Sequence, residues 1–163
     1  MIQAVDLKPR DAIWADLLER AGKFYLNALL PGRLAGRLRV YMTCAYSPSG
    51  DDRLAVCSFL DDCYRPREYE ICFRDFYTLE EMLVLLAHEC VHVAQYATGR
   101  MRTYKNPSRR SFRGCSYDTN LIDYRDLPWE VEAYDLEGAL YAQYVKKAGA
   151  PKSNRKGAAA ATV

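Results

Sequence analysis

Residues 78–99, TLEEMLVLLAHECVHVAQYATG, are the most apolar stretch of the chain and contain both of its histidines. Thr78 followed by Glu81 has the spacing of a capping box, and Gly99 is suited to a left-handed helix end. Residues 82–87 between them have almost purely hydrocarbon side chains. A helix that is apolar all round is buried, and ionisable groups inside a domain need compensation. The stretch therefore predicts a buried helix that carries a polar site.

The polar residues of this helix, His88, Glu89 and His92, have the spacing HExxH. Side chains four residues apart lie one helical turn above each other, so the two imidazoles can converge on one metal ion. Glu89 is rotated by about 100° from His88, which places it beside the ion as a general base. A satisfied core histidine is the ordinary alternative. With only two histidines in 163 residues, both in this motif, we favour a metal site.

The chain is long enough for one domain with a substantial core, which we place at residues 1–149. Residues 150–163 have little to bury and are expected to form a disordered basic tail. The N-terminus lacks the pattern of a signal peptide, and no segment has the length of apolar sequence that crosses a bilayer. We expect a cytoplasmic protein without a membrane partner, and the oligomeric state stays open.

The six cysteines contain no C-x-x-C pair, so a zinc ribbon is not indicated. Cys44 and Cys72 fall at apolar positions of alternating segments, which is typical of small buried residues with free thiols. Cys90 lies within the motif but is expected to point away from both imidazoles. We therefore do not count any cysteine as a metal ligand.

Before the central helix, residues 11–30 have apolar positions at helical spacing and end at Pro31-Gly32. Residues 39–45, 54–60 and 69–74 read as three short strands, and the last alternates most regularly. We expect a small three-stranded, mainly antiparallel meander. An open sheet edge can bind an extended peptide, and residues 69–73 are our candidate for holding a substrate beside the ion.

Residues 100–126 show no sustained periodicity, so a hairpin or a functional loop is expected there. Within them, the arginines and lysine of segment 100–113 alternate with Tyr104 and Phe112, which allows a weak nucleic-acid contact. The net charge of only +2 makes a solvated loop the preferred reading. A last helix is expected over residues 129–147, capped by Asp126.

A third protein ligand is required, and without a third histidine it should be a carboxylate. On the last helix, Glu130 shares a face with Tyr134 and Glu137, whereas Glu132 is turned by roughly 200° from Glu130. Most acids of this helix suit a solvated face near its positive end. The spacing alone leaves open which acid is the ligand.

HECVH followed by PWEVEAY, residues 128–134, resembles the minigluzincins, small HExxH-plus-glutamate metallopeptidases. Within them it looks most like metallopeptidase-like proteins of phages and prophages, with SprT-like and ImmA/IrrE-like relatives. In such families the first Glu of E-x-E-A is the ligand, which implies Glu130 here. The resemblance implies an α+β, zincin-like fold: an N-terminal helix, a small sheet, the HExxH helix and a C-terminal glutamate helix. Tyr134 stands where these families usually carry an acid, and the third histidine of SprT-like proteases is absent.

Together these observations predict a zinc-dependent metallopeptidase that cleaves peptides or proteins by a metal-activated water. His88, His92 and Glu130 would bind Zn²⁺, and Glu89 would be the general base. The oxyanion would be stabilised by Tyr134, Tyr124 or Tyr104, or by the metal alone, and the residues do not decide among them. Tyr134 is the one we name as a catalytic candidate.

Two rival functions are kept. The chain could be a non-catalytic or regulatory zinc-binding module, although a purely structural zinc site has no use for Glu89 and is normally closed by four protein ligands. It could also be a nucleic-acid-associated protease that uses the segment Arg100–Arg113.

Overall fold

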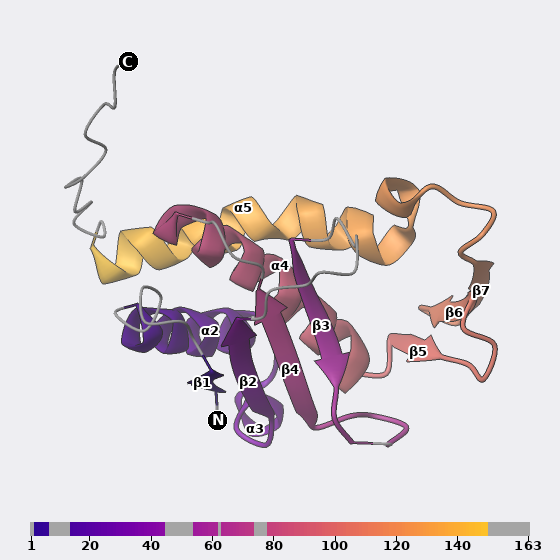
Figure 1. The fold of residues 1–163 in the computed structure, drawn as a ribbon, viewed down its shortest axis with the longest axis horizontal. Coiled ribbons are helices and arrows are strands. Elements are labelled where there is room, and N and C mark those ends of the chain that lie inside the picture. Colours follow the sequence, from indigo (N-terminus) through magenta and orange to yellow (C-terminus); the bar gives the residue numbers. More distant parts are fainter. Residues whose placement is uncertain (1, 7–13, 45–53, 62, 74–77, 150–163) are drawn as a thin grey trace, which may run out of the picture.

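The computed structural model describes residues 2–6, 14–44, 54–61, 63–73 and 78–149. Over these ranges it is an α+β protein, as predicted, with helices packed against one sheet and a second, smaller sheet beyond them (Figure 1). The predicted basic tail at residues 150–163 lies outside the described residues. The ends of the helices and the pairing of the strands determine where His88, Glu89 and His92 lie in the fold.

The central helix α4 spans Leu79–Ala97, and its predicted ends are confirmed. The Thr78 hydroxyl accepts a hydrogen bond from the backbone N–H of Glu81 at 3.2 Å, and the Thr78 N–H donates to the Glu81 carboxylate at 2.7 Å. Gly99 takes the left-handed conformation, with a φ of 74°. The helix is buried along most of its length, because α2, α5 and the sheet all contact it.

The last helix, α5, spans Pro128–Ala148 and lies alongside α4 (Figure 1). The predicted cap at Asp126 is wrong, since this residue ends a short 3-10 helix, Tyr124–Asp126. Leu127 is the N-cap residue and makes no side-chain cap bond. Pro128 still suits the first helical position, because it has no N–H that needs a partner and its φ is already helical.

The first long helix, α2, spans Ala15–Leu29, within the predicted range, and residues 11–13 lie outside the described residues. A further short helix, α3 at Gly32–Ala35, follows where the sequence predicted only an end. Tyr25 of α2 is fully buried and packs edge-on against Tyr144 of α5, with ring centroids 5.7 Å apart. Helix α2 thus joins α4 and α5 into one core.

The predicted meander is wrong in its pairing, although all three of its strands exist. The main sheet has four strands in the order β1-β2-β4-β3. Strand β4 pairs in parallel with β2 and antiparallel with β3, and the strand that the sequence did not predict, β1, pairs in parallel with β2. Alternation reveals a strand but not its partner, which explains the error. Their bounds are β1 Ile2–Asp6, β2 Arg39–Cys44, β3 Ala55–Phe59 and β4 Glu68–Phe73.

The expected hairpin in residues 100–126 is confirmed as a three-stranded antiparallel sheet. Its strands are β5 Met101–Thr103, β6 Arg109–Phe112 and β7 Cys115–Asp118. Arg113 and Gly114 both have positive φ, as a tight two-residue hairpin turn requires. Figure 1 shows this sheet beyond the N-terminal end of α5, where a small apolar cluster holds it. That cluster consists of Met101, Phe112, Leu127 and Trp129.

All six cysteines are free thiols, as predicted. Cys44 and Cys90 are buried, but Cys63 and Cys115 are exposed, so the prediction of burial holds only for some of them. None of the helices in the described ranges combines the length and apolarity needed to span a bilayer.

Loss of the N-terminal cap should measurably destabilise α4. Thr78→Ala is expected to lower the free energy of unfolding by about 1 kcal/mol, because the N–H of Glu81 loses its acceptor. Thr78→Ser retains the hydroxyl and should keep most of the stability. Urea denaturation followed by circular dichroism compares the two, and equal losses would contradict a capping role.

Candidate metal centre

Three buried side chains from two helices converge on one point. His88 and His92 project from α4 and Glu130 from the first turn of α5. Each Nε2 atom lies 3.3 Å from the Glu130 Oε2 atom, and the two Nε2 atoms are 3.2 Å apart. The side chains are 7%, 10% and 5% exposed, so water does not surround them. The structure thus brings together the three residues predicted as ligands, close enough to hold one ion.

The outer nitrogens of both imidazoles have acceptors of their own. The Nδ1 atom of His88 is 2.7 Å from a Glu137 oxygen, and that of His92 is 2.9 Å from the Gln95 side-chain oxygen. The Gln95 amide nitrogen donates to Glu132 and to the backbone carbonyl of Trp129, which fixes the direction of the amide. Both Nδ1 atoms are therefore donors, and both Nε2 atoms face the Glu130 carboxylate.

Glu132, the alternative ligand, lies outside this cluster. One of its oxygens accepts from Arg100 and from Arg113, each at 2.6 Å, and the other accepts from the Gln95 amide at 2.8 Å. Burial alone would raise the pKa of Glu132, but these three donors lower it. Glu132 thus supports His92 through Gln95, and it is not part of the cluster of His88, His92 and Glu130.

The electrostatic environment of the cluster favours positive charge. Burial alone would lower the pKa of His92, but its contact with Glu130 and the charges of Glu89 and Glu130 raise it to about 9. Conversely, burial would raise the pKa of Glu130, yet contacts with both histidines and with Tyr124 lower it to about 2. A carboxylate held ionised between two imidazoles is a strong site for a cation.

Glu89 is buried beside the three ligand candidates, and its place is set by strand β3. Burial raises the pKa of its carboxyl group, which the positive charges of His92 and His88 oppose. The backbone N–H of Cys57 donates to this carboxylate. Neighbouring Cys90 is fully buried in the hydrophobic core, as expected for a residue that is not a ligand.

The three candidate tyrosines lie in different places. The Tyr134 ring is 4.8 Å from the His88 ring, and its side chain is 44% exposed. The Tyr124 hydroxyl donates to the Glu130 carboxylate and the residue lines the cleft beside the cluster. Neither Tyr134 nor the exposed Tyr104 is among the residues that line this cleft. Tyr134, through its contact with His88, and Tyr124, through its contact with Glu130, are the candidates beside the cluster.

A cleft of about 600 Å³ opens onto His92, Glu89 and Glu130. Strand β3 lines one side and residues of the small sheet line another. The sequence placed a substrate beside residues 69–73, but that hypothesis is wrong because β4 lies between β2 and β3, and both of its edges are paired. Among the described strands, the main sheet has β1 at one edge and β3 at the other, and β3 is the edge strand that borders the cleft.

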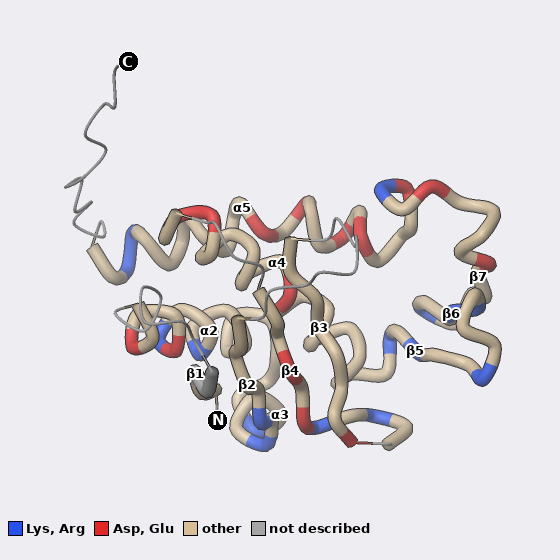
Figure 2. The backbone as a smooth tube through the Cα atoms, viewed as in Figure 1, with Lys and Arg blue, Asp and Glu red and all other residues tan. Residues whose placement is uncertain are grey.

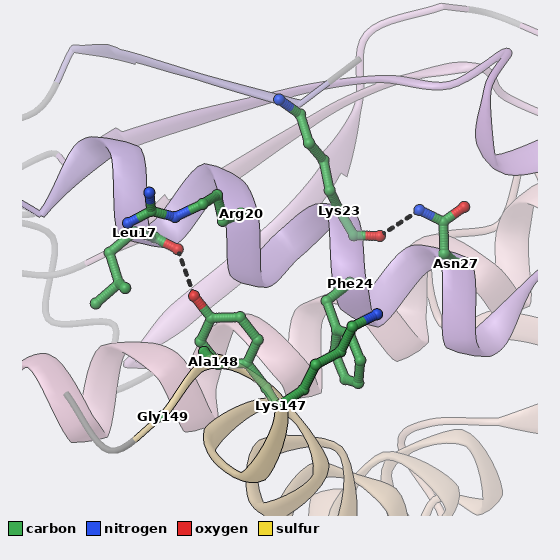
Figure 3. A pocket seen from close by; sticks show the side chains of 9 residues that line it. Leu17, Arg20, Lys23, Phe24, Asn27, Lys147, Ala148 and Gly149 are labelled. Carbon is green, nitrogen blue, oxygen red and sulfur yellow. Dashed lines mark hydrogen bonds between the residues drawn. The ribbon is translucent and has the colours of Figure 1, made fainter.

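A second cavity of about 690 Å³ lies between α2 and the end of α5 and shares no residue with the cleft. In this cavity the Tyr144 hydroxyl donates to the Leu17 carbonyl. Figure 3 shows Lys147 beside Phe24. One of its cations, Arg20, is already paired with Asp16 at 2.7 Å. This cavity is a groove between packed helices and takes no part in the metal centre.

Sequence reasoning did not identify the partners that hold the ligand candidates in place. Glu137 was placed on the correct face of its helix but was not assigned to His88. Gln95 lies three residues after His92 on the same helix, and this i,i+3 spacing could have suggested the contact. Arg100 and Arg113 carry no such signal, because only the fold of the small sheet brings them to Glu132.

Searches of family models, of curated proteins and of solved structures returned no match to this chain.

The two glutamates of α5 should differ in their effect on metal binding. Glu130→Ala removes a carboxylate from the cluster, whereas Glu132→Ala releases Gln95, Arg100 and Arg113 outside the cluster and should weaken zinc binding about tenfold. We expect a much larger loss for Glu130→Ala, measured by competition with a chromogenic chelator. Asp135→Ala, an exposed position on the same helix, is the control. The reverse order would transfer the ligand role to Glu132.

Proposed function

We propose that this protein is a zinc-dependent metallopeptidase. The observation that carries the proposal is the convergence of the two Nε2 lone pairs and the Glu130 carboxylate at separations of 3.2–3.3 Å. Because both Nδ1 atoms face acceptors, both Nε2 atoms face the Glu130 carboxylate and can offer their lone pairs to one ion. A bound cation would compensate this buried carboxylate and take the place of the imidazole protons that otherwise donate to it.

The donor set suits zinc. Two imidazole nitrogens and one carboxylate oxygen are the protein ligands of many catalytic zinc sites, which keep a further position open. Among the described residues, no fourth His, Cys, Asp or Glu belongs to the cluster. His88, His92 and Glu130 would hold the ion, and Glu137 and Gln95 would fix the two rings in the required tautomer.

When bound, zinc supplies a Lewis acid that polarises the scissile carbonyl and lowers the pKa of water toward about 7. Glu89 takes the proton of the attacking water and passes it to the leaving amine. Its environment supports this role, because the low-polarity surroundings make the carboxylate a stronger base and the Cys57 N–H holds it in place.

The peptide substrate would lie along β3. Leu60 donates its N–H to the Glu68 carbonyl, so even-numbered residues of this segment face β4. The odd-numbered residues Ala55, Cys57 and Phe59 therefore turn their peptide groups outward, toward the cleft. An extended peptide can pair with the outward peptide groups of Ala55 and Phe59. The Cys57 N–H between them donates to Glu89 and so places the general base beside the peptide.

The two nearby tyrosines would have separate roles. The Tyr134 hydroxyl makes no hydrogen bond among the described contacts, so we propose that it donates to the oxyanion. The Tyr124 hydroxyl is engaged by Glu130, so we propose that it orients this ligand. The observed order of helix, sheet, HExxH helix and glutamate helix also supports the proposed zincin-like, minigluzincin-like arrangement.

Peptide hydrolysis is favoured over both alternatives. A structural zinc module has no need for a buried carboxylate beside the ion or for a cleft that opens onto it. For a nucleic-acid function, two of the basic residues of the segment 100–113 are less available, because Arg100 and Arg113 pair with Glu132. The free cysteines suit a reducing compartment, and we propose the cytoplasm as the site of action.

Glu89→Gln should separate metal binding from catalysis. The amide keeps the shape of the side chain but cannot accept the proton, so zinc should stay stoichiometric while peptide hydrolysis falls at least about 100-fold. Metal analysis of the purified variant and turnover of a fluorogenic peptide mixture measure both quantities. Unchanged turnover would remove Glu89 from the mechanism.

The tyrosine variants should fail in different ways. Tyr134→Phe is expected to lower kcat by about 100-fold with zinc affinity retained, since an oxyanion donor acts only in the transition state. Tyr124→Phe should instead weaken zinc binding about tenfold. Steady-state kinetics and chelator competition on both proteins test this assignment, and the opposite pattern would exchange the two roles.

A further inference from the structure

The cleft beside the candidate metal centre is lined by one basic side chain among the described residues. Arg110 of β6 is the only lysine or arginine among the described residues that line it. Figure 2 shows basic residues on β5 and β6 and acidic residues along α5. Arg110 is partly buried, whereas its strand neighbour Arg109 is exposed. The alternation of a strand thus turns one arginine into the cleft and the other away from it.

Arg110 is held by neutral groups. Its Nη1 atom donates to the backbone carbonyls of Pro107 and Arg109, at 2.5 and 3.1 Å, and the guanidinium also donates to the Tyr96 hydroxyl. These contacts use three of its five N–H donors, which leaves two for another acceptor. In the described part of the chain no carboxylate pairs with it, in contrast to Arg100 and Arg113, which share Glu132.

The position of Arg110 relative to the metal centre follows from helix α4. Tyr96 comes four residues after His92, so it stands on the same face about 6 Å further along the helix axis. Phe59 at the end of β3 packs edge-on against Tyr96, with ring centroids 5.5 Å apart. The arginine is thus anchored where the edge strand ends. An extended peptide advances about 3.3 Å per residue, so one to three residues span this distance.

We propose that Arg110 determines substrate specificity by binding a carboxylate of the peptide, one to three residues from the scissile bond. This inference rests on the proposed function, because it places the peptide along β3. A fixed guanidinium fork matches the two oxygens of a carboxylate. In a partly buried cleft this attraction is screened less than at the surface. The favoured substrates are peptides with an aspartate, a glutamate or a free C-terminal carboxylate at that distance.

The experiment measures binding, so that its outcome does not depend on turnover. Zinc-loaded Glu89→Gln protein is titrated with fluorescent alanine-rich nonapeptides in which one glutamate is moved along the sequence, each with a matched glutamine peptide. We expect one or two positions at which glutamate binds roughly ten- to a hundredfold more tightly than glutamine. Peptides with amidated and free C-termini separate a terminal carboxylate from a side-chain carboxylate as the recognised group.

Substitutions of Arg110 then test whether this residue causes the preference for glutamate over glutamine. Introduced into the same protein, Arg110→Ala should abolish the preference for glutamate, Arg110→Lys should keep part of it, and Arg110→Glu should replace it by a preference for lysine. Arg109→Ala, on the neighbouring position of the strand, should leave the preference intact. The inference is overturned if no preference exists or if it survives in Arg110→Ala.

Failure of this inference is distinguishable from failure of the proposed function. Peptide hydrolysis by the wild-type protein without any preference for acidic peptides would leave the metallopeptidase and remove the role of Arg110. A carboxylate preference without any zinc-dependent hydrolysis would retain Arg110 as a binding residue and remove the peptidase.

Discussion

The candidate metal centre depends on one constraint, which is that both imidazoles are anchored through their Nδ1 atoms. A buried histidine that lacks a partner could adopt either tautomer and more than one ring orientation. Here Glu137 and Gln95 accept from the two Nδ1 atoms and leave both Nε2 atoms directed at Glu130. Since Glu130 and Glu137 both come from α5, the centre exists only while α5 lies against α4.

The hydrophobic core holds these two helices in that position. Tyr144 of α5 packs against Tyr25 of α2, far along the chain from the motif, and α2 also contacts α4. Parallel strands β2 and β4 present Val40, Met42, Ile71 and Phe73, all fully buried, to the same core. Burial of these side chains, at about 25 cal/mol per Å² of apolar surface, stabilises the packing that offsets the desolvation of four polar residues within α4.

Local features were predictable from the sequence, and contacts between distant segments were not. The capping box, the end at Gly99 and the histidine spacing depend on residues within one helix, and the structure has all three in place. The shared face of Glu130 and Glu137 also followed from helical geometry. Strand pairing was wrong because alternation does not specify a partner, and β1 contributes a parallel neighbour that only the folded chain reveals. For the same reason, the contacts of Arg100 and Arg113 with Glu132 could not be predicted from the sequence.

The contacts of Arg100 and Arg113 with Glu132 also decide which parts of the chain can be exchanged between proteins. A continuous series of hydrogen bonds runs from Arg113, in the turn after β6, through Glu132 and Gln95 to His92. The small sheet lies outside the main core and could be taken for an exchangeable segment. Its removal, however, would leave Glu132 without its two cationic partners. A chimaera that replaces residues 100–118 therefore has to carry two correctly placed arginines with it, or rebuild the support of His92 from other side chains.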